Sequence, residues 1–379
     1  MGKENEDLSL NEDLSLSEKN ENTSPNDENL PPSPPASLKI NKKTARFFIS
    51  IAKKDVHSFI MLGLYDAKNN KIQHLLCRVG KFGNLNVKDP DYVMNMQFLC
   101  NALFFSNKAR LADEGIWREK IGGKPISYQA YDITYEQYLE FVQVLESLQT
   151  PENEFGCYKP DILEDSKESQ NTDDGNDEEV TLTHTIEKLF LPVDVSEIEQ
   201  SVSGLSVHNT CRHSAIELVE KVQHGVGSLV SSNFINDLPY ETCLIYGKPS
   251  EDIPFYVLPA PPTAFVQLDE IKAKVISKLY TRMENMLRLE PDSPQTQKKF
   301  LRLKELYLDI VGPQKDSSLE SLIQNIKEWK ATNTSDLEVL RKTYFWDYLP
   351  FFKRTSSTMK LIKEVEHDLE VEIDNRPHG

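Results

Sequence analysis

Short apolar runs bounded by charged or turn-forming residues recur in the first part of the chain. Each run has the length of a buried β-strand, and the charged residues between runs are typical of turns. The stretch between Tyr92 and Glu119 has a helical pattern instead and predicts one or two helices. The predicted strands cover 45–51, 57–65, 71–79 and 126–133.

Apolar residues at helical spacing appear in three further regions. Residues 135–148 place Tyr138, Phe141, Val142 and Leu145 on one face, which predicts an amphipathic helix. A second helix begins near Asn209 or Thr210, either of which can cap it. From Phe265 onward the pattern is helical throughout and predicts a unit of four or five helices. The chain is therefore expected to be an α+β domain followed by an all-α domain.

Composition divides the chain at three further places. Residues 1–43 are rich in acidic residues and proline and predict a disordered tail, because they cannot bury enough apolar surface to offset chain entropy. Residues 44–262 form the predicted α+β domain, interrupted by an acidic loop at 161–180, and residues 263–379 form the helical domain. An aromatic group in the helical domain either packs against the α+β domain or forms a docking surface: Phe345, Trp346, Tyr348, Phe351 and Phe352.

Cys211 is the strongest candidate for chemistry because it lies at the predicted start of a helix. The positive end of the helix dipole favours a thiolate over a thiol at that place. The helix buries a face made of Ala215, Leu218, Val219 and Val222, and Cys211 lies four residues before Ala215 on the same face. A cysteine in this position can act as a nucleophile if the fold brings a histidine to it.

His57 is the candidate partner, because it opens the apolar run at 57–65 and would lie at the end of a strand. A strand that opens with His, followed by a second strand and later by Asn209-Thr-Cys211-Arg-His213, resembles the circularly permuted papain-like hydrolases of the NlpC/P60 type. This group includes proteins similar to lecithin-retinol acyltransferase and PPPDE peptidases. The present sequence departs from the Asn-Cys signature, because Thr210 separates the Asn from the Cys.

The resemblance implies a third polar residue on the strand after the His-strand. His74 is the candidate there, although a tight hairpin pairs His57 with a residue near Gly80 and leaves His74 about 20 Å away. Gln129 on the strand at 126–133 is the alternative. The catalytic residues expected from the sequence are thus Cys211, His57 and His74.

A papain-like fold with this pair implies a cysteine hydrolase that cleaves peptide or isopeptide bonds through an acyl-thioester, with no cofactor and no metal. Two alternatives stay open: a noncatalytic papain-like module whose helical domain binds a host protein, and a lipid acyltransferase or thioester hydrolase. His208, Cys211, His213 and His224 could also be zinc ligands, but a helix places residues 211 and 213 on different faces.

The charge balance bears on partners. The chain has 60 acidic and 43 basic residues and a net charge of −17, which argues against nucleic acid as a partner. Five cysteines without a CxxC pair suit a reducing compartment, and the sequence predicts neither a transmembrane segment nor a Sec signal. The acidic run from Glu364 to Asp374 resembles the C-terminal signals of type IV secreted bacterial effectors. That resemblance implies export into a host cytoplasm and a host protein as substrate.

Overall fold

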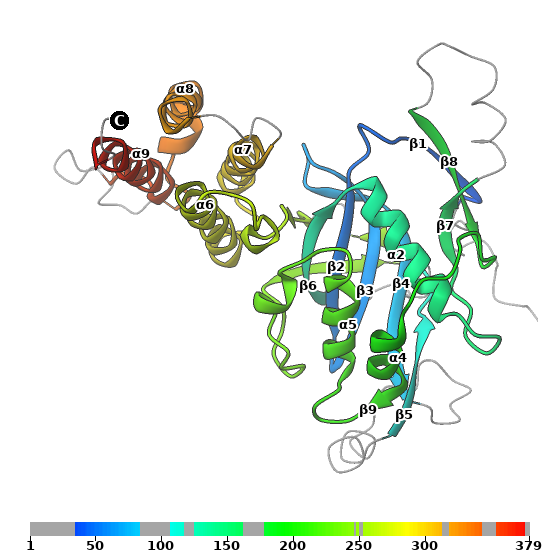
Figure 1. Ribbon diagram of the computed structural model, residues 1–379. Coiled ribbons are helices and arrows are strands. Elements are labelled where there is room, and N and C mark those ends of the chain that lie inside the picture. The colour runs from blue at the N-terminus through cyan, green and yellow to red at the C-terminus, as the bar shows by residue number, and fades with distance from the viewer. Residues whose placement is uncertain are drawn as a thin grey trace, which may run out of the picture. The chain divides into compact units, whose positions relative to one another are not determined.

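A large, mostly antiparallel sheet lies at the centre of the computed structural model (Figure 1). The structure describes residues 35–83, 107–116, 125–161, 178–245, 248–249, 253–312, 318–342 and 354–375. In these ranges the sheet has nine strands in the order β11-β10-β6-β2-β3-β4-β5-β9, with β12 parallel to β6. A second sheet has the order β1-β8-β7. The fold class is α+β, with the last helices at the C-terminal end.

The described strands and helices have the following bounds. The strands are β1 Ser37–Asn41, β2 Phe47–Lys54, β3 His57–Asp66, β4 Lys71–Gly83, β5 Asn107–Asp113, β6 Pro125–Ile133, β7 Cys157–Pro160, β8 Glu179–Thr185, β9 Gly204–Leu205, β10 Tyr240–Ile245, β11 Lys248–Pro249 and β12 Val257–Leu258. The α-helices are α2 Tyr135–Leu148, α4 Ser196–Ser203, α5 Cys211–Glu220, α6 Glu270–Leu289, α7 Pro294–Val311, α8 Leu319–Glu338 and α9 Ser357–Asn375.

Strands β2 and β3 are apolar on both faces because other segments cover both faces. On one face, the ring of Phe47 lies 4.9 Å from that of Tyr138 in α2, and α5 packs on the same side (Figure 1). On the other face, the ring of Phe48 lies 4.9 Å from that of Phe255, in the segment before β12. A strand buried on both faces loses the alternation of apolar and polar residues, which explains the continuous apolar runs in the sequence.

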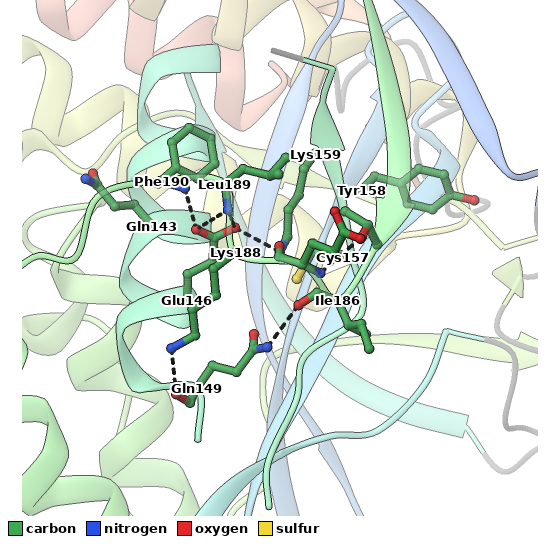
Figure 2. Close-up of polar contacts among 12 residues, drawn as sticks. Gln143, Glu146, Gln149, Cys157, Tyr158, Lys159, Ile186, Lys188, Leu189 and Phe190 are labelled. Atoms are coloured by element: carbon green, nitrogen blue, oxygen red, sulfur yellow. Dashed lines mark hydrogen bonds and ion pairs between the residues drawn. The ribbon is translucent and has the colours of Figure 1, made fainter. Parts of the chain in front are cut away.

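The loop at 186–190 is anchored to α2 through a buried carboxylate (Figure 2). Glu146 lies 2.8 Å from the ammonium of Lys159 in β7 and accepts hydrogen bonds from the backbone N–H groups of Leu189 and Phe190. Both charged side chains are almost completely buried. Nearby, the Gln149 side-chain amide donates to the carbonyl of Ile186 at 2.9 Å. The pair therefore joins the small sheet to the helix that covers the large one.

Helices α6 to α9 bury the apolar stripes that the sequence predicts, and lysines on α6 and α8 pair with carboxylates on α9. Lys278 lies 2.5 Å from Glu364 and 2.7 Å from Asp368. Lys327 lies 2.7 Å from Glu370. Among the helices that the structure describes, none is long and apolar enough to cross a membrane. The aromatic group at residues 345–352 lies outside the described residues.

The structure differs from the sequence-based expectation in three segments. Residues 107–113, placed within a helical stretch, form strand β5, where Ala109 and Leu111 are buried and Lys108 and Arg110 are exposed. Residues 37–41, assigned to the disordered tail, form β1 and pair with β8. Residues 179–185, at the end of the predicted acidic loop, form β8. Residues 1–34 and 162–177, the other parts of those two predictions, lie outside the described residues.

The buried pair of Glu146 and Lys159 gives a prediction about stability. Glu146→Gln keeps the shape of the side chain but leaves the Lys159 ammonium buried without its carboxylate, so we expect the free energy of unfolding to fall by about 3–5 kcal/mol. Glu140→Gln, an exposed position on the same helix, is the matched control and should change it by about 0.5 kcal/mol or less. Urea denaturation measures both, and equal effects would contradict the assignment.

Candidate active site

Cys211 is the first residue of α5, and Thr210 caps this helix. The Thr210 hydroxyl accepts a hydrogen bond from the His213 backbone N–H, and the His213 ring faces the Thr210 hydroxyl and N–H in return. The helix therefore begins at a fixed residue. The sulfur of Cys211 accepts the backbone N–H of Ser58 at 3.2 Å and lies 3.9 Å from the carbonyl oxygen of Val56. These contacts hold the thiol at the start of β3.

His57, the first residue of β3, lies between Cys211 and a carboxylate. Its Nε2 is 2.5 Å from Oε1 of Glu114, and its ring lies close enough to the Cys211 side chain for the two groups to shift each other's pKa values. Because Nε2 faces Glu114, Nδ1 is the nitrogen left for the thiol. The ring of Phe82 lies 4.8 Å from the imidazole, and the imidazole side chain keeps 24% of its surface exposed. Solvent and small molecules can therefore reach the histidine.

Glu114 is the residue that sequence reasoning missed. It follows β5, and its backbone N–H donates to the carbonyl of Arg78 in β4 at 2.9 Å. The Arg78 guanidinium lies 3.1 Å from Oε2 of Glu114, so both carboxylate oxygens are engaged. The signal in the sequence is the alternation in Lys108-Ala-Arg-Leu-Ala, which is typical of a strand that ends next to Glu114.

Gly80 makes room for the contact between His57 and Glu114. In the sheet Gly80 pairs with Phe59 on β3 and with Ala112 on β5, so it lies between the histidine strand and the glutamate strand. A Cβ atom at this position would lie 1.9 Å from Oε1 of Glu114 and 2.8 Å from Nε2 of His57. Only glycine leaves this space free.

His57 and Cys211 shift each other's pKa values, and Glu114 acts on His57 as well. Burial by itself lowers the pKa of His57, but the charge of Glu114 and the hydrogen bonds to Cys211 and Glu114 outweigh burial and raise that pKa to about 10. Burial by itself raises the pKa of Cys211, but the hydrogen bond and positive charge of His57, the Ser58 N–H and the charge of Lys81 lower it below its usual value. Both directions favour a thiolate next to an imidazolium at neutral pH.

Lys81 holds the loop that leads into α5. Its ammonium, 3% exposed, donates to the carbonyl oxygens of Ser201 at 2.8 Å and Asn209 at 2.9 Å, to the Asn209 side-chain oxygen at 2.7 Å and to the Ser214 hydroxyl at 3.0 Å. Burial lowers the pKa of Lys81 to about 8, although the charges of Cys211 and Glu217 oppose that shift. Asn209 belongs to the Asn-Cys signature that the sequence resembles, and in the structure it is a hydrogen-bond acceptor for the buried Lys81.

Arg212, the second residue of α5, fixes this helix to the sheet. Its side chain is completely buried, and Nε donates to the Ser58 hydroxyl at 2.8 Å. The two terminal nitrogens donate to the carbonyl oxygens of Ser231 at 3.3 Å and Asn236 at 3.1 Å. Since Ser58 also donates its N–H to Cys211, one residue of β3 positions two consecutive residues of the helix.

The structure brings His57 and Cys211 together but not His74 or Gln129. His74 pairs with Leu64, seven residues along β3 from His57, because the hairpin between β3 and β4 is tight. Gln129 is buried on β6 and pairs with Ile51, two strands from β3. The third position beside His57 belongs to Glu114. No group of three or more metal-ligating side chains occurs within the described residues, including the histidines proposed for zinc.

Comparison with protein-family models, with curated proteins and with solved structures found no match for this chain.

The shifted protonation of Cys211 gives a prediction about its reactivity. Alkylation follows the thiolate fraction, so the rate rises with pH through the pKa of the folded thiol and levels off above it. For Cys211 the midpoint should lie below that of an ordinary cysteine thiol, and His57→Ala should raise it, because the neighbouring positive charge is removed. Iodoacetamide labelling followed by peptide mass spectrometry measures this.

Two internal references sharpen that experiment. Cys77 and Cys157 are buried with their sulfurs 3.1 Å apart and should react only after unfolding. His224→Ala removes an exposed histidine and should leave the midpoint unchanged. An unchanged midpoint in His57→Ala would mean that the histidine does not influence the thiol. Cys100 lies outside the described residues.

Gly80→Ala tests the geometry without removing a functional group. The added methyl must displace the Glu114 carboxylate, the movable end of a side chain, so the pKa of His57 should fall and the alkylation midpoint of Cys211 should rise. Gly227→Ala is the control, because the nearest atom to its Cβ would be Oε2 of Glu220 at 3.5 Å, an ordinary contact. If both variants keep the wild-type midpoint, Glu114 does not act on His57 through this contact.

Proposed function

We propose that this protein is a cysteine-dependent hydrolase with Cys211 as nucleophile, His57 as acid and base, and Glu114 as the residue that orients His57. The observation that carries the proposal is the position of His57, which lowers the pKa of the Cys211 thiol and has its Nε2 2.5 Å from Oε1 of Glu114; the three residues come from the start of α5, the start of β3 and the residue after β5. A nucleophile next to a base that is oriented by a third group is the arrangement that covalent catalysis needs.

The chemistry runs in two steps. In the first, the Cys211 thiolate attacks a carbonyl carbon, and the imidazolium of His57 donates its Nδ1 proton to the leaving nitrogen or oxygen, which departs and leaves an acyl-thioester. In the second, neutral His57 takes a proton from water, the resulting hydroxide attacks the thioester, and the thiolate of Cys211 leaves. Glu114 stays ionised and stabilises the imidazolium each time it forms.

The start of α5 supplies the group that stabilises the developing oxyanion. The backbone N–H of Cys211 is one of the first N–H groups of a helix, which the helix's own hydrogen bonds leave without an acceptor. It is positioned next to the sulfur that attacks, so the carbonyl oxygen of a bound acyl group can accept from it. The helix dipole adds to this effect.

Peptide or isopeptide bonds are the substrate class that we favour, and lipid acyl esters are the second. The order of a histidine strand followed much later by a cysteine helix supports a permuted papain-like arrangement, in which both activities occur. The position of Glu114 departs from the expected pattern, because β5 is two strands from the histidine strand. The noncatalytic alternative has one observation in its favour: Cys211 is only 6% exposed.

The export signal expected from the acidic C-terminal run stays a prediction. Glu364, Asp368, Glu366 and Glu370 each lie within ion-pair distance of lysines on α6 or α8. These carboxylates therefore have a structural use in α9, besides any role in recognition by a secretion system. Glu372 and Asp374 are exposed, so they are the members of the run that an export receptor could reach most easily.

An activated ester tests the proposed function directly. Incubation with p-nitrophenyl acetate should release p-nitrophenol and leave an acetyl group on the peptide that contains Cys211, and Cys211→Ser should abolish both. Glu114→Gln should slow the release about 10- to 1000-fold, because the imidazolium loses the charge that stabilises it. Glu140→Gln, an exposed position on α2, is the matched control and should keep the wild-type rate.

Peptide and lipid substrates are then separated by offering fluorogenic isopeptide-linked peptides and short-chain glycerol esters to the same variants. Turnover of one class that depends on both Cys211 and Glu114 assigns the substrate class. A folded protein that forms no acyl adduct and turns over neither class would leave the noncatalytic binding module as the better account.

A further inference from the structure

A cavity of about 940 Å³ lies far from the candidate active site, between the ends of the central strands and helix α7. It opens at the end of β3 opposite to His57: Tyr65 lines the cavity and is eight residues along the strand, which corresponds to about 26 Å. The ionisable side chains around it are Lys43, Arg46, Tyr65, Asp66, Lys68, Asp132, Lys298, Arg302, Lys304, Glu305 and Asp336.

The floor of the cavity is a buried and electrically balanced cluster. The Lys304 ammonium lies 2.7 Å from Asp132 Oδ2, and it donates to the Tyr65 hydroxyl at 2.9 Å and to the Val257 carbonyl at 2.7 Å. The Tyr65 hydroxyl in turn donates to the other Asp132 oxygen. The negative charge of Asp132 is therefore already compensated by Lys304.

The other carboxylates of the lining also have partners. Arg302 lies 3.0 Å from Glu305 and 3.4 Å from Asp336. Asp66 accepts hydrogen bonds from the Asn69 side chain and from the backbone N–H groups of Lys68 and Asn69. Each acidic group in the wall thus has at least one oxygen engaged by a group of the protein itself.

Three cationic side chains of the lining have no such compensation. Arg46, Lys68 and Lys298 form no ion pair with any carboxylate in the part of the chain that the structure describes. Burial lowers the pKa of Lys304 and the charge of Arg46 adds to that shift, so the Arg46 guanidinium lies close to another cation. All three side chains are exposed, and in a chain with 60 acidic residues and a net charge of −17 they give the rim of this cavity a local excess of positive charge.

We propose that this cavity is a binding site for a small polyanion that carries two or more phosphate groups. Arg46 directly precedes β2, Lys68 lies in the turn between β3 and β4, and Lys298 lies on α7, so a single anionic group cannot neutralise them as well as several linked ones can. The apolar lining consists mainly of alanine and leucine side chains, and the aromatic ring among the lining residues, that of Tyr65, is only 4% exposed and has the Lys304 ammonium 5.0 Å from its centre, so it offers little surface for an aromatic base to stack on. The recognised part is therefore a phosphorylated group, either free or as the headgroup of a lipid.

Because the site lies about 26 Å from His57, it is independent of the proposed hydrolase chemistry. A ligand that contacts Arg46 and Lys298 together would join the sheet to α7 and resist their separation. Binding should therefore raise the unfolding temperature as well as produce heat, since a ligand that binds only the folded state stabilises it.

Inorganic tripolyphosphate is the first probe, used with the full-length chain in isothermal titration calorimetry and in thermal unfolding. We expect saturable binding that raises the unfolding temperature and weakens as the salt concentration rises. Arg46→Ala combined with Lys298→Ala should weaken binding about tenfold or more, because two charge-assisted contacts are lost. Lys360→Ala combined with Lys363→Ala removes the same charge from exposed positions on α9 and should keep the wild-type affinity.

Vesicles that contain a multiply phosphorylated lipid headgroup separate the two sources of the ligand. Co-sedimentation that requires Arg46 and Lys298 assigns the site to a headgroup, whereas binding of tripolyphosphate without vesicle binding assigns it to a free phosphorylated compound. The proposal is overturned if neither probe binds the wild-type chain, or if the Arg46/Lys298 variant and the Lys360/Lys363 variant lose affinity equally. The Cys211 labelling experiment is unaffected by either outcome, so the two proposals fail or stand separately.

Discussion

The buried ammonium of Lys81 is the interaction on which the candidate site depends most. It joins β4 to the loop that leads into α5, through acceptors on Ser201, Asn209 and Ser214. A backbone loop between two helices has many carbonyl groups that need donors once they are buried, and one lysine with several donors satisfies them in one place. Because the loop cannot move away from β4, the sulfur of Cys211 stays within reach of β3.

The alternation of side chains along β4 places the supporting Lys81 on one face of the sheet and His57 and Glu114 on the other. Successive residues of β4 point to opposite faces of the sheet. Arg78 and Gly80 share the face of His57 and Glu114, whereas Lys81 points to the face that α5 covers. The supporting charge and the reacting groups are thus on opposite sides of one strand. Cys211 lies at the end of the sheet, where the start of the helix reaches the histidine.

The sequence was sufficient for features that depend on local spacing. The amphipathic helix at 135–148, the histidine at the start of a strand and the cysteine at the start of a helix all follow from periodicity and capping residues within about fifteen positions. The hairpin between β3 and β4 was predictable for the same reason, and its register places Gly80 opposite Phe59. This register also pairs His74 with Leu64, far along β3 from His57, so it argues against His74 as a catalytic residue.

Glu114 was not predictable in the same way, because its partners are distant in sequence. Its role depends on β5 pairing with β4, on Gly80 leaving space and on Arg78 binding the second carboxylate oxygen. The segment before Glu114 alternates Ala109 and Leu111 with charged residues, which is a strand pattern. It was nevertheless assigned to a helix, because the longer stretch around it has a helical pattern. Lys81 is similar, since a lysine within an apolar run gives no sign of the loop that it will bind.

Charge distribution illustrates the same limit at the scale of the whole chain. The total of −17 describes an acidic protein, yet it says nothing about where individual charges are compensated. On α9 the excess carboxylates pair with Lys278, Lys327 and Lys330, so part of the acidic surplus stabilises helix packing. Around the cavity at the far end of β3 the balance is reversed, and Arg46, Lys68 and Lys298 form no ion pair with a carboxylate of the described residues. A net charge therefore excludes broad classes of partner, whereas a local surplus of opposite sign identifies the place where a charged ligand would be neutralised.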